Sequence, residues 1–302
     1  MSEQVFYNFV TVRGTIQDYG FPEWRDDKKM GQLTLKVNDN NAYIDIHNSR
    51  KATTNQVVKF FKEIEKGQKI QIRGRLDENE YDGKLNRRVK VFAGKNPIEY
   101  NLLSQDDEEK YVAKIAGNVF QIPELRYEPS LERFSGNNIP VLEFPVAIFN
   151  LYNRETQEND LTVEEVILNE MKNNLEYGVD NDIYDKDEQE KIKKIIKKTE
   201  DNDIETQYKC LNKFMQLFNP NFFNITILNL TAYKDVAEDL SEGIEMLDNI
   251  DMGVRVNNFQ DLDEFGTTVG YVNEIEVVKV YDINKYFEEN FEEDDDDFFD
   301  NI

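Results

Sequence analysis

The sequence predicts a mainly β protein with two small barrels in tandem, a helical insertion in the second barrel and a disordered acidic tail. Three observations support this. Apolar and polar residues alternate along several short stretches, as in half-buried strands. A short pattern recurs, because residues 12–16 read VRGTI and residues 115–119 read IAGNV. The last fifteen residues, 288–302, carry nine acidic and no basic side chains, and so much like charge prevents independent folding.

The first hundred residues predict five strands and one helix. In residues 33–37, Leu33, Leu35 and Val37 alternate with polar neighbours, and in residues 54–65 apolar residues recur at helical spacing before Gly67. The order strand, strand, strand, helix, strand, strand is that of an OB-fold barrel. The expected strands are 5–16, 33–37, 42–47, 69–76 and 88–93, the helix is 54–65, and polar loops cover 19–29 and 77–88.

The same order is expected to recur in the second unit. After the IAGNV strand, apolar stretches predict further strands, and a helix is expected between the third and fourth of them. The expected strands are 141–149, 223–230, 252–256 and 268–281, with a helix at 233–247. About seventy residues with helical periodicity, 153–222, interrupt this unit. We therefore expect domains at 1–102 and 103–285 and a tail at 286–302.

The net charge of −25 is unevenly distributed along the chain. Residues 1–100 carry 18 Lys and Arg against 14 Asp and Glu, a net charge of +4, and residues 101–302 carry −29. This asymmetry predicts a basic binding module joined to an acidic region. No apolar run reaches the roughly 20 residues that span a bilayer, and no signal peptide is recognisable. With Cys210 as the single cysteine, we expect a cytoplasmic protein without disulfides.

The residue content argues against an enzyme. His47 is the single histidine and Cys210 the single cysteine, so a Cys/His zinc site and a histidine-based catalytic pair are not expected. Neither a GxxxxGK[ST] nor a GxGxxG phosphate loop occurs. We therefore expect no catalytic residues, no metal and no cofactor. Carboxylate pairs that could hold Mg²⁺ abound, but in a chain with 61 acidic residues they carry little information.

Candidate binding residues lie where an OB-fold usually binds its ligand, on strands two and three and on the loops flanking them. Aromatic residues alternate there with basic ones, which suits single-stranded nucleic acid, because rings stack on bases and cations follow the phosphates. Trp24 is equally compatible with a plug beneath the barrel, and Arg73 and Arg75 with a solvated strand. The candidates are Trp24, Arg25, Lys28, Lys29, Lys36, Tyr43, Arg73, Arg75, Tyr81, Lys84, Arg87 and Arg88.

Two further charged segments invite interpretation. The tail combines acid with aromatic residues, which predicts a docking peptide for a partner protein, although a solubilising tail is the simpler alternative. A lysine run at 191–198 in the insertion is either a solvated helix face or a contact for DNA or for the tail. The partner-binding candidates in the tail are Phe291, Asp294, Asp295, Asp296, Asp297, Phe298 and Phe299.

The predicted strand order, the basic strand KGQKIQIRGRL at 66–76 and the tail ending DDDDFFDNI resemble the single-stranded-DNA-binding proteins of bacteria and their phages. The two linked barrels, the insertion and the tip of the tail look most like a bacteriophage replication protein, which would place it in the bacterial host cell. The resemblance implies sequence-independent binding of single-stranded DNA in replication, recombination or repair. It also implies that the tail recruits a polymerase, primase or helicase and competes with DNA. The alternative is an acidic interaction protein or DNA mimic that binds no DNA.

Overall fold

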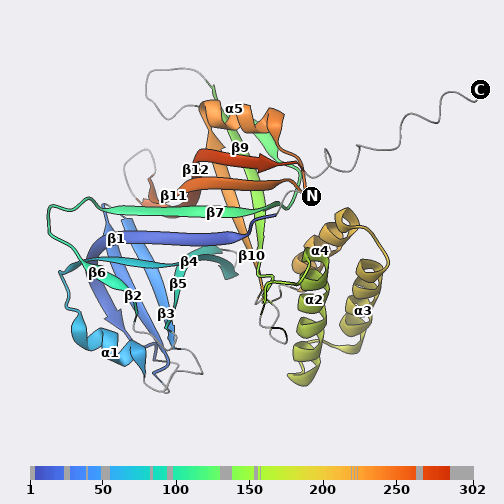
Figure 1. Cartoon of the computed structure of the whole chain (residues 1–302), viewed down its shortest axis with the longest axis horizontal. Helices are drawn as coiled ribbons and strands as arrows, with labels where there is room; N and C mark the ends of the chain where they lie inside the picture. Colours follow the sequence, from blue (N-terminus) through green and yellow to red (C-terminus); the bar gives the residue numbers. More distant parts are fainter. Residues whose placement is uncertain are drawn as a thin grey trace, which may run out of the picture.

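The structure is a computed structural model, and it confirms a mainly β protein. It describes residues 4–23, 28–38, 40–48, 55–81, 84–93, 98–129, 138–152, 156, 158–218, 220, 222, 224–262 and 268–285. The backbone alone is described at 79–81, 84–86, 129, 258–262 and 268–273. Figure 1 shows the elements, whose bounds are β1 Tyr7–Gly20, β2 Met30–Val37, β3 Asn40–Asn48, α1 Gln56–Glu63, β4 Lys69–Tyr81, β5 Lys84–Ala93, β6 Tyr100–Leu102, β7 Lys110–Val119, β8 Glu124–Pro129, β9 Asn138–Phe149, α2 Val163–Asp180, α3 Lys186–Glu200, α4 Ile204–Phe218, β10 Ile225–Tyr233, α5 Lys234–Gly243, β11 Asn249–Leu262 and β12 Thr268–Asn284.

Strands β1 to β5 form a closed barrel, which we call the first ring. Strand β1 pairs with β2 and β4, β2 pairs with β3, and β5 pairs with β4 and, in parallel, with β3. Helix α1 lies between β3 and β4, so the predicted strand order of an OB-fold is confirmed. Asn55 caps α1 by accepting from the backbone N–H groups of Val57 and Val58. The apolar residues of α1, Val57 and Phe60, are buried in the core.

Five later strands pair in the same cyclic order, and we call them the second ring. Strand β7 pairs with β9 and β11, β11 with β12, β12 with β10 through one parallel pair, and β10 with β9. Helix α5 lies between β10 and β11, as α1 lies between β3 and β4. In Figure 1, α1 lies at the bottom of the first ring and α5 at the top of the second. One additional strand, β8, pairs with the outer edge of β9.

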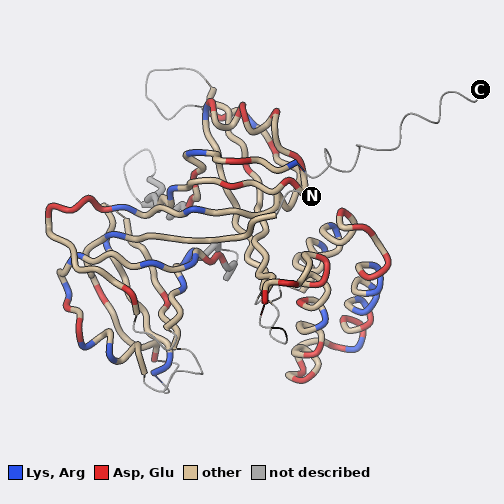
Figure 2. The backbone as a smooth tube through the Cα atoms, viewed as in Figure 1, with Lys and Arg blue, Asp and Glu red and all other residues tan. Residues whose placement is uncertain are grey.

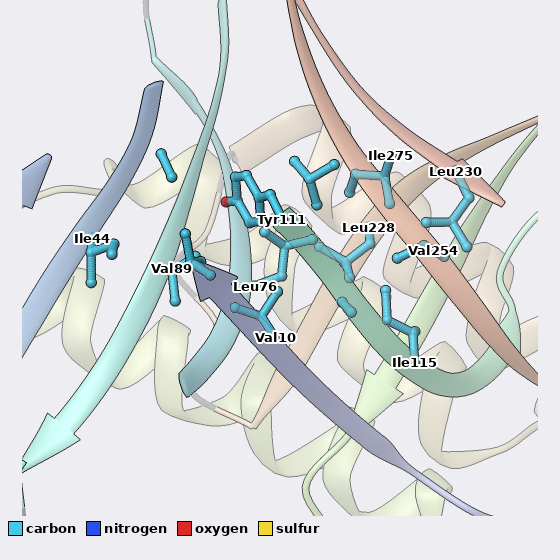
Figure 3. Close-up of a cluster of buried hydrophobic side chains, with 14 of the residues drawn as sticks. Val10, Ile44, Leu76, Val89, Tyr111, Ile115, Leu228, Leu230, Val254 and Ile275 are labelled. Atoms are coloured by element: carbon cyan, nitrogen blue, oxygen red, sulfur yellow. The ribbon is translucent and has the colours of Figure 1, made fainter. Parts of the chain in front are cut away.

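The two rings are joined edge to edge and share a core. Strands β1 and β7 run antiparallel side by side, with partners from Tyr7 and Ala116 to Arg13 and Lys110. One continuous apolar cluster contains residues of both rings. Figure 3 shows part of this cluster, where Tyr111 of β7 lies among Leu76, Val89 and Leu228. Burial raises the pKa of Tyr111, which keeps its hydroxyl neutral.

Helices α2, α3 and α4 lie between β9 and β10, where helical periodicity predicted an insertion. They pack around an apolar cluster of their own, which also takes in Phe120 and Phe149 of the second ring. A buried hydrogen bond from Asn118 Nδ2 to Tyr208 Oη, 2.9 Å long, ties α4 to β7. The cluster buries Ile192, Ile195 and Ile196 of α3, so the lysines of this helix face outward.

Several expected boundaries are wrong. The predicted loop 77–88 is the outer part of a β4–β5 hairpin, whose partners run from Arg75 and Lys90 to Tyr81 and Lys84. Strand β1 extends to Gly20, into the predicted loop 19–29. The helix expected at 233–247 is the shorter α5. The tail 286–302 lies outside the described residues.

Candidate nucleic-acid interface

The outer surface of β2, β3 and β5 forms a continuous face on the first ring. Alternation along these strands puts Leu35, Ile44 and Val89 into the core and their neighbours outside. The register places Thr34 beside Tyr43 on β2 and β3. We call this surface the β2–β3–β5 face, and its outward residues are Gln32, Thr34, Lys36, Asn41, Tyr43, Asp45, His47, Arg88, Lys90 and Phe92.

Two aromatic rings are exposed on the β2–β3–β5 face. Tyr43 is 42% exposed, and the guanidinium of Arg88 lies 6.0 Å from the centroid of its ring. Phe92 is 62% exposed and stacks on His47 with 5.4 Å between ring centroids and 23° between ring planes. An exposed ring held by a neighbour is suited to stacking on an unpaired base. Duplex DNA hides its base faces, so such rings favour single strands.

The cations around these rings are of two kinds, those held in ion pairs and those for which no ion pair is described. Arg88 pairs with Asp45 at 2.7 Å, and Lys90 pairs with Asp77 at 2.7 Å, which holds both side chains in place. Lys36 on β2 and Arg73 and Arg75 on β4 are exposed, and no ion pair is found for them in the described part of the chain. Figure 2 shows basic residues along these strands, whereas the connection between β6 and β7 is acidic.

The sequence predicts that Arg87 lies in a loop of the candidate binding surface, and this prediction is wrong. Arg87 is a buried residue of β5, and its Nε donates to Glu78 Oε2 at 2.5 Å. The other oxygen of Glu78 accepts from Asn229 Nδ2 of β10 at 2.5 Å. Arg87 therefore holds the β4–β5 hairpin of the first ring against the second ring. A loop would have left Arg87 in solvent, but continuation of the ladder turns it inward beside Glu78.

The remaining sequence-predicted residues have varied outcomes. Lys28 and Lys29 are exposed just before β2, and the ammonium of Lys28 lies 5.8 Å from the ring centroid of Phe21. Tyr81 and Lys84 close the hairpin, but their side chains lie outside the described residues. Outside the described residues are also Trp24, Arg25 and the tail candidates Phe291, Asp294, Asp295, Asp296, Asp297, Phe298 and Phe299.

Sequence reasoning missed Phe92, His47 and Lys90. A signal for Phe92 existed, because Val89 and Val91 alternate inward in residues 88–93 and so direct position 92 outward. The stack of Phe92 on His47 was not readable, since it depends on the parallel pairing of β3 with β5. His47 and Phe92 are partners in this ladder but lie 45 residues apart in the sequence.

The corresponding surface of the second ring is acidic. Arg126 of β8 is held between Glu128 and Glu143, with Nε to Oε1 and Nη2 to Oε1 distances of 2.6 Å each. On β10, the hydroxyl of Tyr233 donates to Glu274 of β12. Burial raises the pKa of Tyr233, and its bond to Glu274 adds to the rise. A face with this many carboxylates repels phosphate, so this surface of the second ring differs in charge from the β2–β3–β5 face.

The described part of the chain offers no arrangement for metal chemistry. Among these residues, no group of three or more His, Cys, Asp and Glu side chains is placed to hold a metal ion. Cys210 is buried in the helical cluster around α2, α3 and α4. No described helix has both the length and the apolar character that crossing a membrane requires.

Comparison with known proteins gives structural similarity only. No family model and no curated protein matches the chain. The chain is similar to the wild-type single-stranded DNA binding protein from Thermus aquaticus, with 14% identity, a TM-score of 0.45 and coverage of 91% of this chain and 92% of that chain. The Plasmodium falciparum SSB complex with ssDNA matches with 16% identity and a TM-score of 0.24, over 34% of this chain and all of that chain. Similarity of this degree does not decide function.

Proposed function

We propose that this protein binds single-stranded DNA without sequence specificity and without catalysis. One observation carries the proposal: exposed Tyr43 and Phe92 lie among cations on the outer face of a closed barrel with the strand order of an OB-fold. Each ring gives a base a stacking surface, while Lys36, Arg73 and Arg75 are available for phosphates. Stacking and charge attraction are indifferent to base identity, so the protein is expected to coat single strands in replication, recombination or repair.

We also propose that the chain contains two OB domains, at 1–102 and 103–285, with the insertion at 153–222 in the second. Support comes from equivalent glycines. Gly14 pairs with Ile70 and Gly117 with Ile250, each at the corresponding point of its ring. A Cβ at Gly14 would meet the carbonyl oxygen of Lys36, and one at Gly117 would lie 2.6 Å from that of Ala147. Both strands therefore need glycine where the neighbouring strand approaches closely.

A second correspondence supports the same proposal. After α1 the chain reads IEKGQKI at 64–70, and after α5 it reads IEMLDNI at 244–250. Gly67 and Leu247 both have positive φ, 85° and 80°. Gly67 N–H donates to Ile16 O and Leu247 N–H to Val119 O, each at 2.9 Å. Two turns with the same geometry at equivalent places favour two copies of one module, a repeat that the sequence analysis had not noticed.

We propose that the acidic residues 286–302 compete with DNA for the β2–β3–β5 face and recruit a replication protein when DNA displaces them. The support is the charge difference between the basic first hundred residues and the acidic remainder. Deletion must begin at Tyr286, since β12 continues through Asn284. Deleting 286–302 should tighten DNA binding at low salt and leave it unchanged at high salt. Equal affinities at every salt concentration would exclude competition.

The DNA-binding proposal is tested by titrating the full chain with fluorescent oligo-dT, oligo-rU and duplex DNA at several salt concentrations. Single-stranded DNA should bind, with a log–log salt slope of about 0.7 per phosphate contacted. Tyr43→Ala should weaken binding by roughly 1–3 kcal/mol, whereas Tyr43→Phe, which keeps the ring, should bind like the wild type. Absence of any complex at low salt would instead favour an acidic interaction protein that does not bind DNA.

A further inference from the structure

A second surface with aromatic and basic residues lies where the two rings join. It covers the outer side of β4, β1, β7, β11 and β12 and contains a shallow hollow of about 570 Å³. None of its residues on β1, β7 or β12 was a candidate in the sequence. We call it the junction face, and its outward residues are Tyr7, Phe9, Thr11, Arg73, Val112, Lys114, Val278, Lys279 and Tyr281.

The register of five strands arranges these residues into a path across the joint. Thr11 on β1 pairs with Arg73 on β4. Two residues away, Phe9 pairs with Lys114 on β7. Lys114 pairs with Gly253 on β11, and Gly253 pairs with Lys279 on β12. The path therefore starts on the first ring and ends on the second, and it needs the edge-to-edge pairing of β1 with β7.

Large apolar side chains are exposed along this path. Phe9 is 65% exposed and stacks on Tyr7 at 5.7 Å between centroids, which holds one side of the Phe9 ring and leaves the other to solvent. Tyr281 is 51% exposed, with the ammonium groups of Lys114 and Lys279 at 4.9 Å and 5.0 Å from its centroid. Exposed rings beside cations form the same combination as on the β2–β3–β5 face.

The junction face is also continuous with the β2–β3–β5 face. Lys90 of that face pairs with Arg75 on β4. Arg73, two residues before Arg75 on the same strand, also points outward and lies at the edge of the hollow. From β5 to β12 there are five steps between neighbouring strands, or about 24 Å at about 4.8 Å a step. Cations at Lys90, Arg75, Arg73, Lys114 and Lys279 therefore follow one another around the molecule.

The charge of the junction face favours a polyanion over a second copy of the chain. Asp251 and Glu276 each have a cation of the second ring nearby, with Lys114 Nζ at 3.3 Å and Arg255 Nη1 at 3.6 Å, and Asp282, the ladder partner of Asp251, is exposed on β12. The cations of the face and its edge, Arg73, Arg75, Lys114, Arg255 and Lys279, outnumber these three carboxylates in a chain of net charge −25. Two copies joined through this face would bring those excess cations together, which costs energy unless an anion lies between them.

We propose that the junction face is a second contact for single-stranded DNA, which passes from the β2–β3–β5 face over β4 onto the second ring. The inference rests on the proposed function. It gives the second ring a contact for DNA, which the acidic surface of that ring does not offer. Phe9 stacks on a base there, and Arg73, Lys114 and Lys279 contact phosphates. A short oligonucleotide is held by the β2–β3–β5 face alone, and a long one is held by both faces.

The test compares oligo-dT of about 8 nucleotides, within the roughly 4–16 that one OB-fold covers, with oligo-dT of about 30 nucleotides. Phe9→Ala should weaken binding of the long oligonucleotide about tenfold and leave the short one within twofold. Lys279→Ala should lower the salt slope for the long oligonucleotide by about 0.7. Lys59→Ala, which removes an exposed lysine from α1, is the matched control and should change neither.

Each other outcome overturns the proposal in a recognisable way. If both variants bind long DNA like the wild type, the junction face does not contact DNA. If Phe9→Ala halves the molecular mass in solution and leaves DNA binding unchanged, a second copy occupies the face. If Phe9→Ala tightens binding of both oligonucleotides, the acidic chain end occupies it. If the wild type binds neither oligonucleotide, the proposed function itself fails, and this inference fails with it.

Discussion

Arg87 and Arg88 are neighbours in the sequence but differ in their surroundings. Arg88 points outward from β5, where it pairs with Asp45 and lies over Tyr43. Arg87 points inward, and its side chain and that of Glu78 are 5% and 2% exposed. A strand alternates its side chains between two faces, so one of two adjacent arginines must turn toward the core. Identical residue types therefore serve different purposes, and composition alone does not distinguish them.

Replacing Arg87 should reduce stability and not DNA affinity. Arg87→Met leaves Glu78 buried without its charge partner, which is expected to cost about 3–5 kcal/mol of unfolding free energy. The double variant Arg87→Met/Glu78→Leu should recover much of this loss, because no unpaired charge remains. Urea unfolding measures both, and oligo-dT titration should give wild-type affinity for folded Arg87→Met. Weaker DNA binding with unchanged stability would show that Arg87 contacts DNA after all.

Glu274 makes stability depend on pH. Burial raises the pKa of its carboxyl, the nearby charge of Glu276 raises it further, and the hydrogen bond from Tyr233 opposes the rise. A raised folded-state pKa means that the stability contributed by Glu274 is full below the unfolded value, about 4.3, and is lost as pH rises through the folded value. Glu274→Gln should therefore gain stability relative to the wild type as pH rises from about 4 to neutral. Parallel curves from urea unfolding at each pH would contradict this.

At the scale of elements, the alternation of apolar and polar residues predicts which side chains face inward. It does not predict a strand whose residues are nearly all polar or charged. Leu33, Leu35 and Ile44 were correctly assigned to the core of the first ring. The polar, turn-rich run at 77–88 predicts a loop, yet it forms the outer hairpin of β4 and β5, in which Asp77 and Arg88 are cross-strand partners. The junction face was not predictable at all, because it forms only when β1 pairs with β7. Local sequence patterns do not predict which strands pair when the strands lie far apart in the chain.

The close approach of neighbouring strands makes two glycines sensitive to a single methyl group. Gly14→Ala and Gly117→Ala should each lower the free energy of unfolding by about 1–3 kcal/mol, since the added Cβ meets a backbone carbonyl that cannot move without bending the strand. Gly20→Ala is the control, because no atom lies within 4 Å of a Cβ placed there. Urea midpoints of the three variants measure the effect. Equal urea midpoints would show that the backbone near Gly14 and Gly117 shifts to accommodate the methyl group at little cost in stability.

At the scale of the whole molecule, charge and core divide the chain differently. Charge separates a basic first hundred residues from an acidic remainder. The two proposed binding surfaces follow that division only in part, since the junction face draws cations from both rings. The core does not divide at the joint. Val10, Leu76, Leu228 and Ile275 belong to one buried apolar cluster, so each ring completes the other's packing. Two modules of this kind are expected to act as one body.

A shared core predicts that the two rings unfold in one transition. Leu228→Ala on β10 should cost about 2–5 kcal/mol, and its effect should reach the first ring, because Leu228 packs in the same cluster as Leu76 and Val89. Hydrogen exchange at increasing urea, read by mass spectrometry, follows the two rings separately, through the amides of β2 and β3 for the first ring and of β9 and β10 for the second. In Leu228→Ala both sets of amides should lose protection at the same lower urea midpoint. If the midpoint of β2 and β3 stays at its wild-type value, the rings unfold independently, and a rigid path for DNA across their joint loses its physical basis.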